Sequence, residues 1–280
     1  MQVFRYHAGF KNPSACVITW GNMDGVHLGH QYLIRKNTDL AGQKNLKSMV
    51  VIFEPITVKC FVKPNITMLS DLTGRLEKIK RLGVDIVLVV PFKRFFYERD
   101  AAWFVHEFLM KACCAHHIVI GSDAVFGKGR SGDISFLREN FYPENQAVHI
   151  PPALLADNGV RISSYLIRQA WKNLAFTDVK AMLGTSLMLR CRFYYDQQKG
   201  QLTAILPKKW HNTFLLGFYV VTIVQHHVSL LAEISIESTG EGVKLIKLHL
   251  NEVLLPGVYG IQGQYFCGKN ANSLEDFVEK

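Results

Sequence analysis

Gly21-Asn22-Met23-Asp24-Gly25-Val26-His27-Leu28-Gly29-His30 follows directly after the apolar run Ala15–Trp20. A β-branched run that ends in a glycine-rich turn is typical of a strand that leads into a helix through a tight loop. Such a loop exposes backbone N–H groups, and the positive end of the helix dipole adds to their attraction for phosphate. Because His27 and His30 stand three residues apart, both imidazoles can face one anion. The stretch predicts a phosphate-binding turn.

The glycines of this turn, Gly21, Gly25 and Gly29, allow the backbone to bend and to approach a ligand closely. The spacing does not favour zinc, because a helical metal pair is more often His-x-x-x-His and no third ligand stands at a standard spacing. We therefore predict no metal site. The alternative, two solvated histidines in an ordinary turn, fits an isolated His-x-Gly-His about equally well.

Two later segments also combine glycine, hydroxyl and basic residues. They are Gly121-Ser122-Asp123-Ala124-Val125-Phe126-Gly127-Lys128-Gly129-Arg130-Ser131-Gly132-Asp133 and Arg161-Ile162-Ser163-Ser164-Tyr165-Leu166-Ile167-Arg168. Ser163 and Ser164 suit the N-cap of a following helix, whose start again presents hydroxyls and N–H groups to an anion. Taken alone, the serine pair is equally an ordinary cap, and Lys128 and Arg130 are more often a solvated loop.

Taken together, the three segments resemble the HIGH-type nucleotidyltransferases, and in particular the bacterial FAD synthetase family of bifunctional riboflavin kinase/FMN adenylyltransferases. The resemblance implies transfer of AMP from ATP to FMN, giving FAD and pyrophosphate. It implies that His27 and His30 contact the ATP phosphates, with His30 stabilising the transition state. Asn22 and Asp24 would shape the loop and reach the substrate phosphate.

The resemblance also implies the remaining binding residues. The three glycines would admit the nucleotide, Asp123 would bind the ATP ribose, and a further group would contact flavin or the β and γ phosphates: Phe53, Phe96, Phe126, Gly127, Arg161, Ser163, Ser164 and Arg168. For each of the aromatic residues, burial in the core is the commoner role, by roughly two to one. We expect Mg²⁺ to enter on the nucleotide phosphates.

The pattern up to about residue 183 is of apolar strands alternating with helices, which predicts a Rossmann-like α/β fold with a parallel sheet. The expected strands are Cys16–Gly21, Met49–Phe53, Ile86–Val90, His117–Gly121 and Ala147–Ile150. One helix is expected to start at Ser70 or Asp71 and run to Leu82, with Gly83 ending it. A second is expected from Asp100 to about Cys114.

After Gly184 the pattern changes to β-rich segments separated by turns, which predicts a small antiparallel β-barrel-like domain. The resemblance to the bacterial FAD synthetases implies that residues 1–184 are a nucleotidyltransferase domain and that residues 185–280 are a riboflavin-kinase-like domain. The kinase signature is degenerate: Gln201–Ile205 lacks the proline and asparagine of the family's Gly-Phe-Pro-Thr-Ala-Asn. Lys247 stands where the family has its catalytic glutamate, and a charged lysine cannot accept a proton. Kinase activity is expected to be lost.

Other departures affect the acceptor rather than ATP. Ile56-Thr57 replaces His-Pro in the family's Phe-Glu/Asp-Pro-His-Pro, and Met23 and Ala124 replace residues that are usually aromatic. Two alternatives therefore stay open: a related nucleotidyltransferase with a different phosphorylated acceptor, and a flavin- or nucleotide-binding protein without turnover.

The composition suits a protein that binds small anions. The formal net charge of +9 is satisfied by ATP and a flavin phosphate, and the basic residues are dispersed, so no nucleic-acid partner is expected. No apolar run approaches the ~20 residues that span a bilayer, and residues 1–7 lack the apolar segment of a signal peptide. We expect a cytoplasmic protein with no membrane partner, and the pattern leaves the oligomeric state open.

Overall fold

The computed structural model describes residues 1–57, 66–141, 147–156, 159–196, 201–206, 208–210, 216–225, 228–238, 244–249 and 257–267. The chain forms two compact units, Met1–Pro64 with Leu72–Ser163, and Asn65–Asp71 with Ser164–Lys280. Within the described part of the chain, no helix combines the length and the apolar character that crossing a membrane requires.

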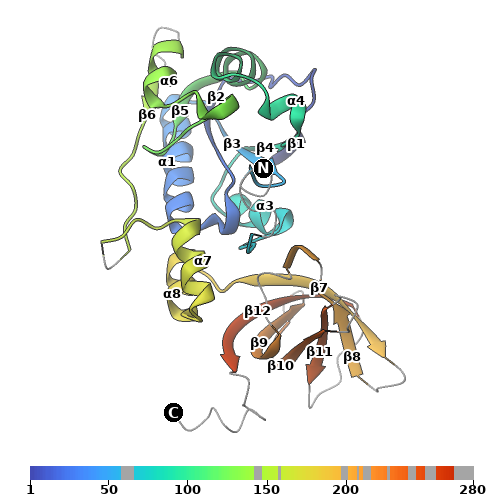
Figure 1. The fold of residues 1–280 in the computed structure, drawn as a ribbon. Coiled ribbons are helices and arrows are strands. Elements are labelled where there is room, and N and C mark those ends of the chain that lie inside the picture. Colours follow the sequence, from blue (N-terminus) through green and yellow to red (C-terminus); the bar gives the residue numbers. More distant parts are fainter. Residues whose placement is uncertain are drawn as a thin grey trace. The chain divides into compact units, whose positions relative to one another are not determined.

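The first unit is built on a six-stranded sheet with the order β1-β4-β3-β2-β5-β6, and every neighbouring pair is parallel (Figure 1). Its strands are β1 (Gln2–Arg5), β2 (Cys16–Gly21), β3 (Lys47–Glu54), β4 (Ile86–Pro91), β5 (Ala115–Val119) and β6 (Ala147–His149). The predicted parallel sheet is confirmed. Only β1 was not expected, because it is a short and largely exposed edge strand without a run of buried apolar residues.

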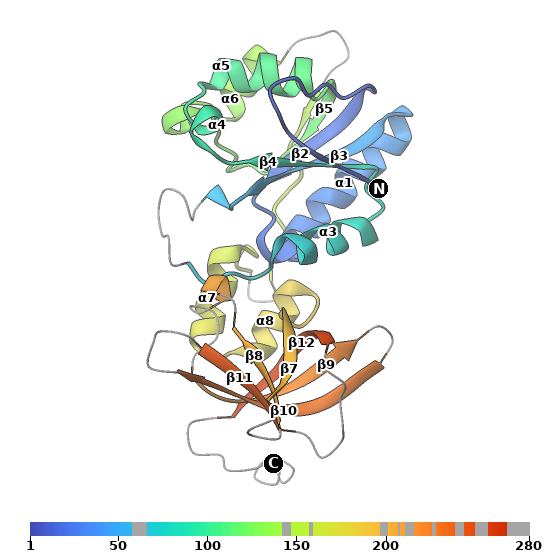
Figure 2. The ribbon, with the colours of Figure 1, turned by 90° about the vertical axis from the view of Figure 1, so that its right-hand side faces the viewer.

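Helices cover both faces of this sheet (Figure 2). One face packs on α1 (Leu28–Lys44) and α3 (Leu72–Arg81), which bury Ile34, Ala41 and Ile79 against the strands. The other packs on an aromatic core beneath α4 (Arg94–Tyr97), α5 (Ala101–Trp103), the π-helix η2 (Phe104–Ala112) and α6 (Ile134–Asn140). The arrangement is the doubly wound, Rossmann-like one that the sequence predicts.

The two long helices expected from the sequence are present, with one difference. α3 begins one residue after Asp71, and Gly83, which follows it, has a left-handed φ of 77°. In the second region Phe104, Val105, Phe108 and Leu109 are buried. The backbone there winds as a π-helix, in which the N–H of Cys113 bonds to the carbonyl of Phe108 at 2.9 Å.

The second unit contains a closed antiparallel barrel with the strand order β10-β11-β8-β7-β12-β9. The strands are β7 (Met188–Asp196), β8 (Gln201–Ile205), β9 (Gly217–Gln225), β10 (Val228–Ser238), β11 (Lys244–His249) and β12 (Gly257–Cys267), with a 3₁₀ turn at Lys208–Trp210. Alternate residues such as Ile234, Ile236, Ile246 and Leu248 are buried. The predicted barrel is confirmed.

Two helices precede the barrel and group with it, α7 (Ser164–Lys172) and α8 (Phe176–Leu183). α8 ends at Gly184, which has a left-handed φ of 70°. The compact units therefore divide the chain before α7, while the sequence pattern changes after α8. The assignment of residues 1–184 to one nucleotidyltransferase domain stays a proposal about function.

Candidate functional site

The Gly21–His30 turn leaves the central strand β2 and enters helix α1. It contains a 3₁₀ turn at Asp24–Val26 (η1), and three of its residues have left-handed φ: Met23 (48°), Gly25 (78°) and Val26 (42°). A β-branched residue such as Val26 rarely adopts this conformation, which costs on the order of 1–3 kcal/mol and persists only where the surroundings impose it. The turn is therefore held in its shape by its neighbours.

His27 and His30 lie together at the N-terminus of α1. The His27 side chain caps the helix, accepting a hydrogen bond from the backbone N–H of His30 at 3.3 Å. The two rings are stacked, with centroids 3.6 Å apart and planes inclined by 20°. His27 is buried and His30 half-buried. The predicted proximity of the imidazoles is confirmed, and it sets them beside the positive end of a 17-residue helix.

Gly29 brings the third segment against the first. A Cβ at position 29 would lie 3.2 Å from the Ile162 carbonyl oxygen and 3.2 Å from ring atoms of His27. A side chain here would make unusually tight contacts, whereas glycine allows the close approach. The beginning of the Arg161–Arg168 segment therefore lies close to Gly29 and to the ring of His27.

Asp123 joins the second segment to the third. Its carboxylate accepts a hydrogen bond from Arg161 Nη2 at 2.7 Å, in an ion pair that is largely exposed. Gly121 is close to the same pair, because a Cβ there would lie 3.1 Å from Asp123 Oδ1 and 3.6 Å from Arg161 Nη2. Asp123 was expected to bind the ATP ribose and Arg161 to bind the phosphates, whereas in the structure the two side chains pair with each other.

Ser164 and Arg168 belong to the second unit. Helix α7 begins at Ser164, so Ser163 stands immediately before it, as the predicted capping position requires. Arg168 Nε donates to the carbonyl oxygen of Thr67 at 2.8 Å within that unit. Their predicted phosphate contacts stay predictions.

The three aromatic candidates lie in the hydrophobic core of the first unit. Phe53, Phe96 and Phe126 are 7%, 4% and 7% exposed. Phe53 and Phe96 pack on each other with ring centroids 5.8 Å apart, and Phe126 packs edge-on to Trp20. All three rings therefore pack in the core, and their predicted flavin contacts stay predictions.

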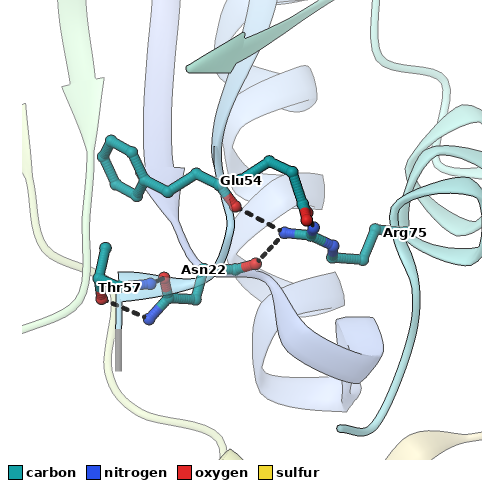
Figure 3. A network of polar contacts seen from close by, with 5 residues as sticks. Asn22, Glu54, Thr57 and Arg75 are labelled. Carbon is teal, nitrogen blue, oxygen red and sulfur yellow. Dashed lines mark hydrogen bonds and ion pairs between the residues drawn. The ribbon is translucent and has the colours of Figure 1, made fainter. Parts of the chain in front are cut away.

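Sequence reasoning missed Arg75 of α3, which joins the ends of β2 and β3 (Figure 3). Its side chain is fully buried; Nη1 donates to the carbonyl oxygens of Asn22 at 2.9 Å and Phe53 at 3.0 Å, and Nη2 pairs with the Glu54 carboxylate. A signal was present in the sequence. Arg75 stands three residues after Leu72 and four before Ile79, on the apolar face, where a charge indicates a buried partner.

Lys78, one turn further along α3, also supports the turn. Its ammonium group donates to the Gly25 carbonyl oxygen at 2.9 Å. Burial is the main cause that lowers the pKa of Lys78 to about 8; the nearby Arg81 lowers it further, and Asp24 opposes both. Two cations of α3 therefore bind carbonyl oxygens of the turn.

The side-chain amide of Asn22 bonds to Thr57. Its Oδ1 accepts from the backbone N–H of Thr57 at 2.8 Å, and its Nδ2 donates to Thr57 Oγ1 at 2.9 Å (Figure 3). The amide thus ties the turn to the segment that follows β3. Reach toward a substrate phosphate, the other role expected of Asn22, stays a prediction.

Two further observations concern possible metal ligands and a charged pair in the barrel. Across the described ranges, no three His, Cys, Asp or Glu side chains gather as metal ligands. In the barrel, Lys247 Nζ forms an ion pair with Glu237 Oε2 at 2.5 Å. Lys247 lies opposite Thr203 of β8 in the strand register. The residue that replaces the expected glutamate therefore has a carboxylate partner of its own.

Comparison with known proteins identifies relatives that match most of the chain. Residues 10–166 match the family model described as FAD synthetase. The chain is 30% identical to a bifunctional riboflavin kinase/FMN adenylyltransferase of Pseudomonas fluorescens, over 84% of this chain and 78% of that protein. It is 28% identical to one of Escherichia coli K12, over 94% of this chain and 86% of that protein.

A solved structure shares the fold. The crystal structure titled macrolide-efflux protein from Streptococcus pneumoniae matches with a TM-score of 0.79 at 24% identity, over 99% of this chain and 95% of that one. The likeness extends over both units, and at this identity it concerns the fold alone.

Proposed function

The chain belongs to the FAD synthetase family, and from this premise we propose that it transfers the adenylyl group of ATP to FMN. The chain is a nucleotidyltransferase, and ATP and FMN are the substrates that fit its family. In the proposed step an FMN phosphate oxygen attacks the α-phosphorus of ATP. The bond from that phosphorus to the bridging oxygen breaks, and pyrophosphate leaves.

One observation carries the proposal: within the first unit a chain of contacts joins the start of α1 to residues 161–163 and, through Arg161, to Asp123. The stacked pair of His27 and His30 lies beside Ile162, and Arg161 links that segment to Asp123. Because the phosphate nucleophile is already anionic at neutral pH, the protein has to position it and to stabilise charge on the transferring and leaving phosphates. A helix N-terminus with two imidazoles and an arginine supplies such groups.

We assign His30 to transition-state stabilisation and His27 to the ATP phosphates. His27 is buried as the cap of α1, which leaves it less able to move than the half-buried His30. Arg161 and Ser163 are assigned to the leaving phosphates, and Ser164 and Arg168 keep that assignment from the resemblance. Mg²⁺ is assigned to the nucleotide itself, since this ion commonly binds through substrate phosphates.

We also infer that the barrel does not phosphorylate riboflavin. A general base must accept the proton of the attacking hydroxyl, and the ammonium of Lys247, paired with Glu237, cannot do so. A cytoplasmic location, and the lack of nucleic-acid and membrane partners, remain part of the proposal.

One chromatographic assay tests these points by supplying either FMN or riboflavin with MgATP. We expect FAD from FMN and no FMN from riboflavin. The variant His30→Ala should lower the rate at least about a hundredfold, the scale for losing one transition-state donor. The control His116→Ala removes an exposed histidine on β5 and should leave the rate unchanged.

Each other outcome assigns a different function. Pyrophosphate release that depends on another phosphate ester, with FMN inert, would favour the alternative acceptor. Ligand binding without any product would favour a non-catalytic protein. Conversion of riboflavin would overturn the inference about Lys247, and an unchanged rate in His30→Ala would overturn the role of His30.

A further inference from the structure

The Asn22 amide and Thr57 exchange two hydrogen bonds between segments that are 35 residues apart in the chain. Asn22 opens the turn after β2, and Thr57 follows the end of β3. Both residues are half-buried. Each polar atom of the amide has a partner on the same threonine, so the pair fixes both the position and the orientation of the Asn22 side chain.

The pair depends on two groups that few residues supply together. The backbone N–H donates to Oδ1 and the side-chain oxygen accepts from Nδ2. A proline at position 57 would have neither group, valine would keep only the first, and serine would keep both. Of these four residues, only threonine and serine can form both hydrogen bonds with Asn22.

Arg75 holds the same residue from the backbone side. Its guanidinium binds the Asn22 carbonyl oxygen and the Phe53 carbonyl oxygen, so the ends of β2 and β3 are tied together below the turn (Figure 3). Asn22 is thus held at its carbonyl by Arg75 and at its side-chain amide by Thr57. The left-handed residue Met23 comes directly after Asn22 in the chain, and Val26 comes three residues later.

We propose that Thr57 is a positioning residue for adenylyl transfer, which holds the histidine turn in its active shape through Asn22. The inference rests on the proposed function for its kinetic readout, and it adds to that function a residue from outside the three segments. Thr57 also links the nucleotide turn to the segment where the chain departs from its relatives' acceptor motif.

The test compares Thr57→Val, Thr57→Ser and Thr57→Pro with the control Thr73→Val, which removes a hydroxyl from an exposed threonine of α3. Two quantities are measured: the Kd of the α,β-methylene analogue of MgATP, by calorimetry without acceptor, and kcat/KM for FAD formation. We expect Thr57→Val to weaken analogue binding and to lower kcat/KM about fivefold each, the scale of one lost hydrogen bond. Thr57→Pro should lose about thirtyfold or more, while Thr57→Ser and the control stay within twofold.

A double-mutant cycle separates positioning from general stabilisation. If Thr57 acts through Asn22, then adding Thr57→Val to an Asn22→Ala protein should cause no further loss of analogue affinity or of kcat/KM. The Tm of the Asn22→Ala protein should also stay unchanged. Equal losses in both backgrounds, or a Thr57→Val protein within twofold of wild type, would overturn the proposal. A wild type that binds the analogue but forms no FAD would refute the FMN acceptor alone, because the Kd series still decides the role of Thr57. A wild type that binds no analogue would refute both.

Discussion

Arg75→Met removes the buried charge that joins the ends of β2 and β3. Losing one partner of a buried ion pair costs about 3–5 kcal/mol when the other charge stays buried. Glu54 keeps 40% of its side chain exposed, so water can solvate its carboxylate. The cost therefore falls mainly on the carbonyl oxygens of Asn22 and Phe53, at about 1–3 kcal/mol for each acceptor left without a donor. We expect a loss of about 3 kcal/mol in the free energy of unfolding.

Thermal unfolding followed by circular dichroism measures this loss. At about 2–4 °C per kcal/mol for a unit of roughly 150–250 residues, the Tm should fall by about 6–12 °C. The control Lys80→Met removes an exposed cation from the same helix and should change stability by no more than about 0.5 kcal/mol. A Tm for Arg75→Met within about 2 °C of wild type would refute the view that Arg75 ties the strand ends.

Two further predictions concern the same unit. Gly127→Ala places a Cβ 2.6 Å from a backbone nitrogen at the start of α5, at a φ of 73°, and should lower the free energy of unfolding in urea by about 3 kcal/mol. The control Gly129→Ala, whose Cβ would meet nothing within 4 Å, should lower it by about 1 kcal/mol. Equal losses in the two variants would contradict the argument. Burial lowers the pKa of His117 and of His149, whose rings lie 5.6 Å apart, with smaller contributions from neighbouring cations that include Lys44. The unfolded chain therefore binds more protons below the ordinary pKa of about 6.5. The contribution of the two histidines to the free energy of unfolding should be full above that pH and should fall as the pH is lowered through it. His149→Gln should reduce the slope of the free energy of unfolding against pH. The same slope in both proteins would contradict the assignment of this pH dependence to the two histidines.

The sheet and the position of its loops were predictable because their signals are local. A buried β-branched strand, a glycine turn and a capped helix each lie within about ten residues, and parallel topology follows from their alternation. The pairing of His27 with His30 was predictable for the same reason. The strand β1 was not, because an exposed edge strand of four residues carries little periodicity.

The support of the turn could not be predicted in this way. Thr57 and Arg75 reach Asn22 across 35 and 53 residues, and only the strand order, with β2 next to β3, brings them together. The pair of Asp123 and Arg161 likewise joins side chains 38 residues apart in the chain. The pattern of apolar residues marks position 75 as inward-facing, but it does not reveal the partner.

The strand order also has a consequence for how the protein is made. β1 pairs with β4, so Gln2 finds its partner only when Ile86 has been synthesised, and β2 needs both β3 and β5. Such non-local parallel pairing folds slowly, and it leaves apolar strands uncovered on the nascent chain. The turn with its two histidines leaves the ribosome before residues 57, 75 and 162, whose contacts hold it. It is therefore synthesised before it can take its final shape.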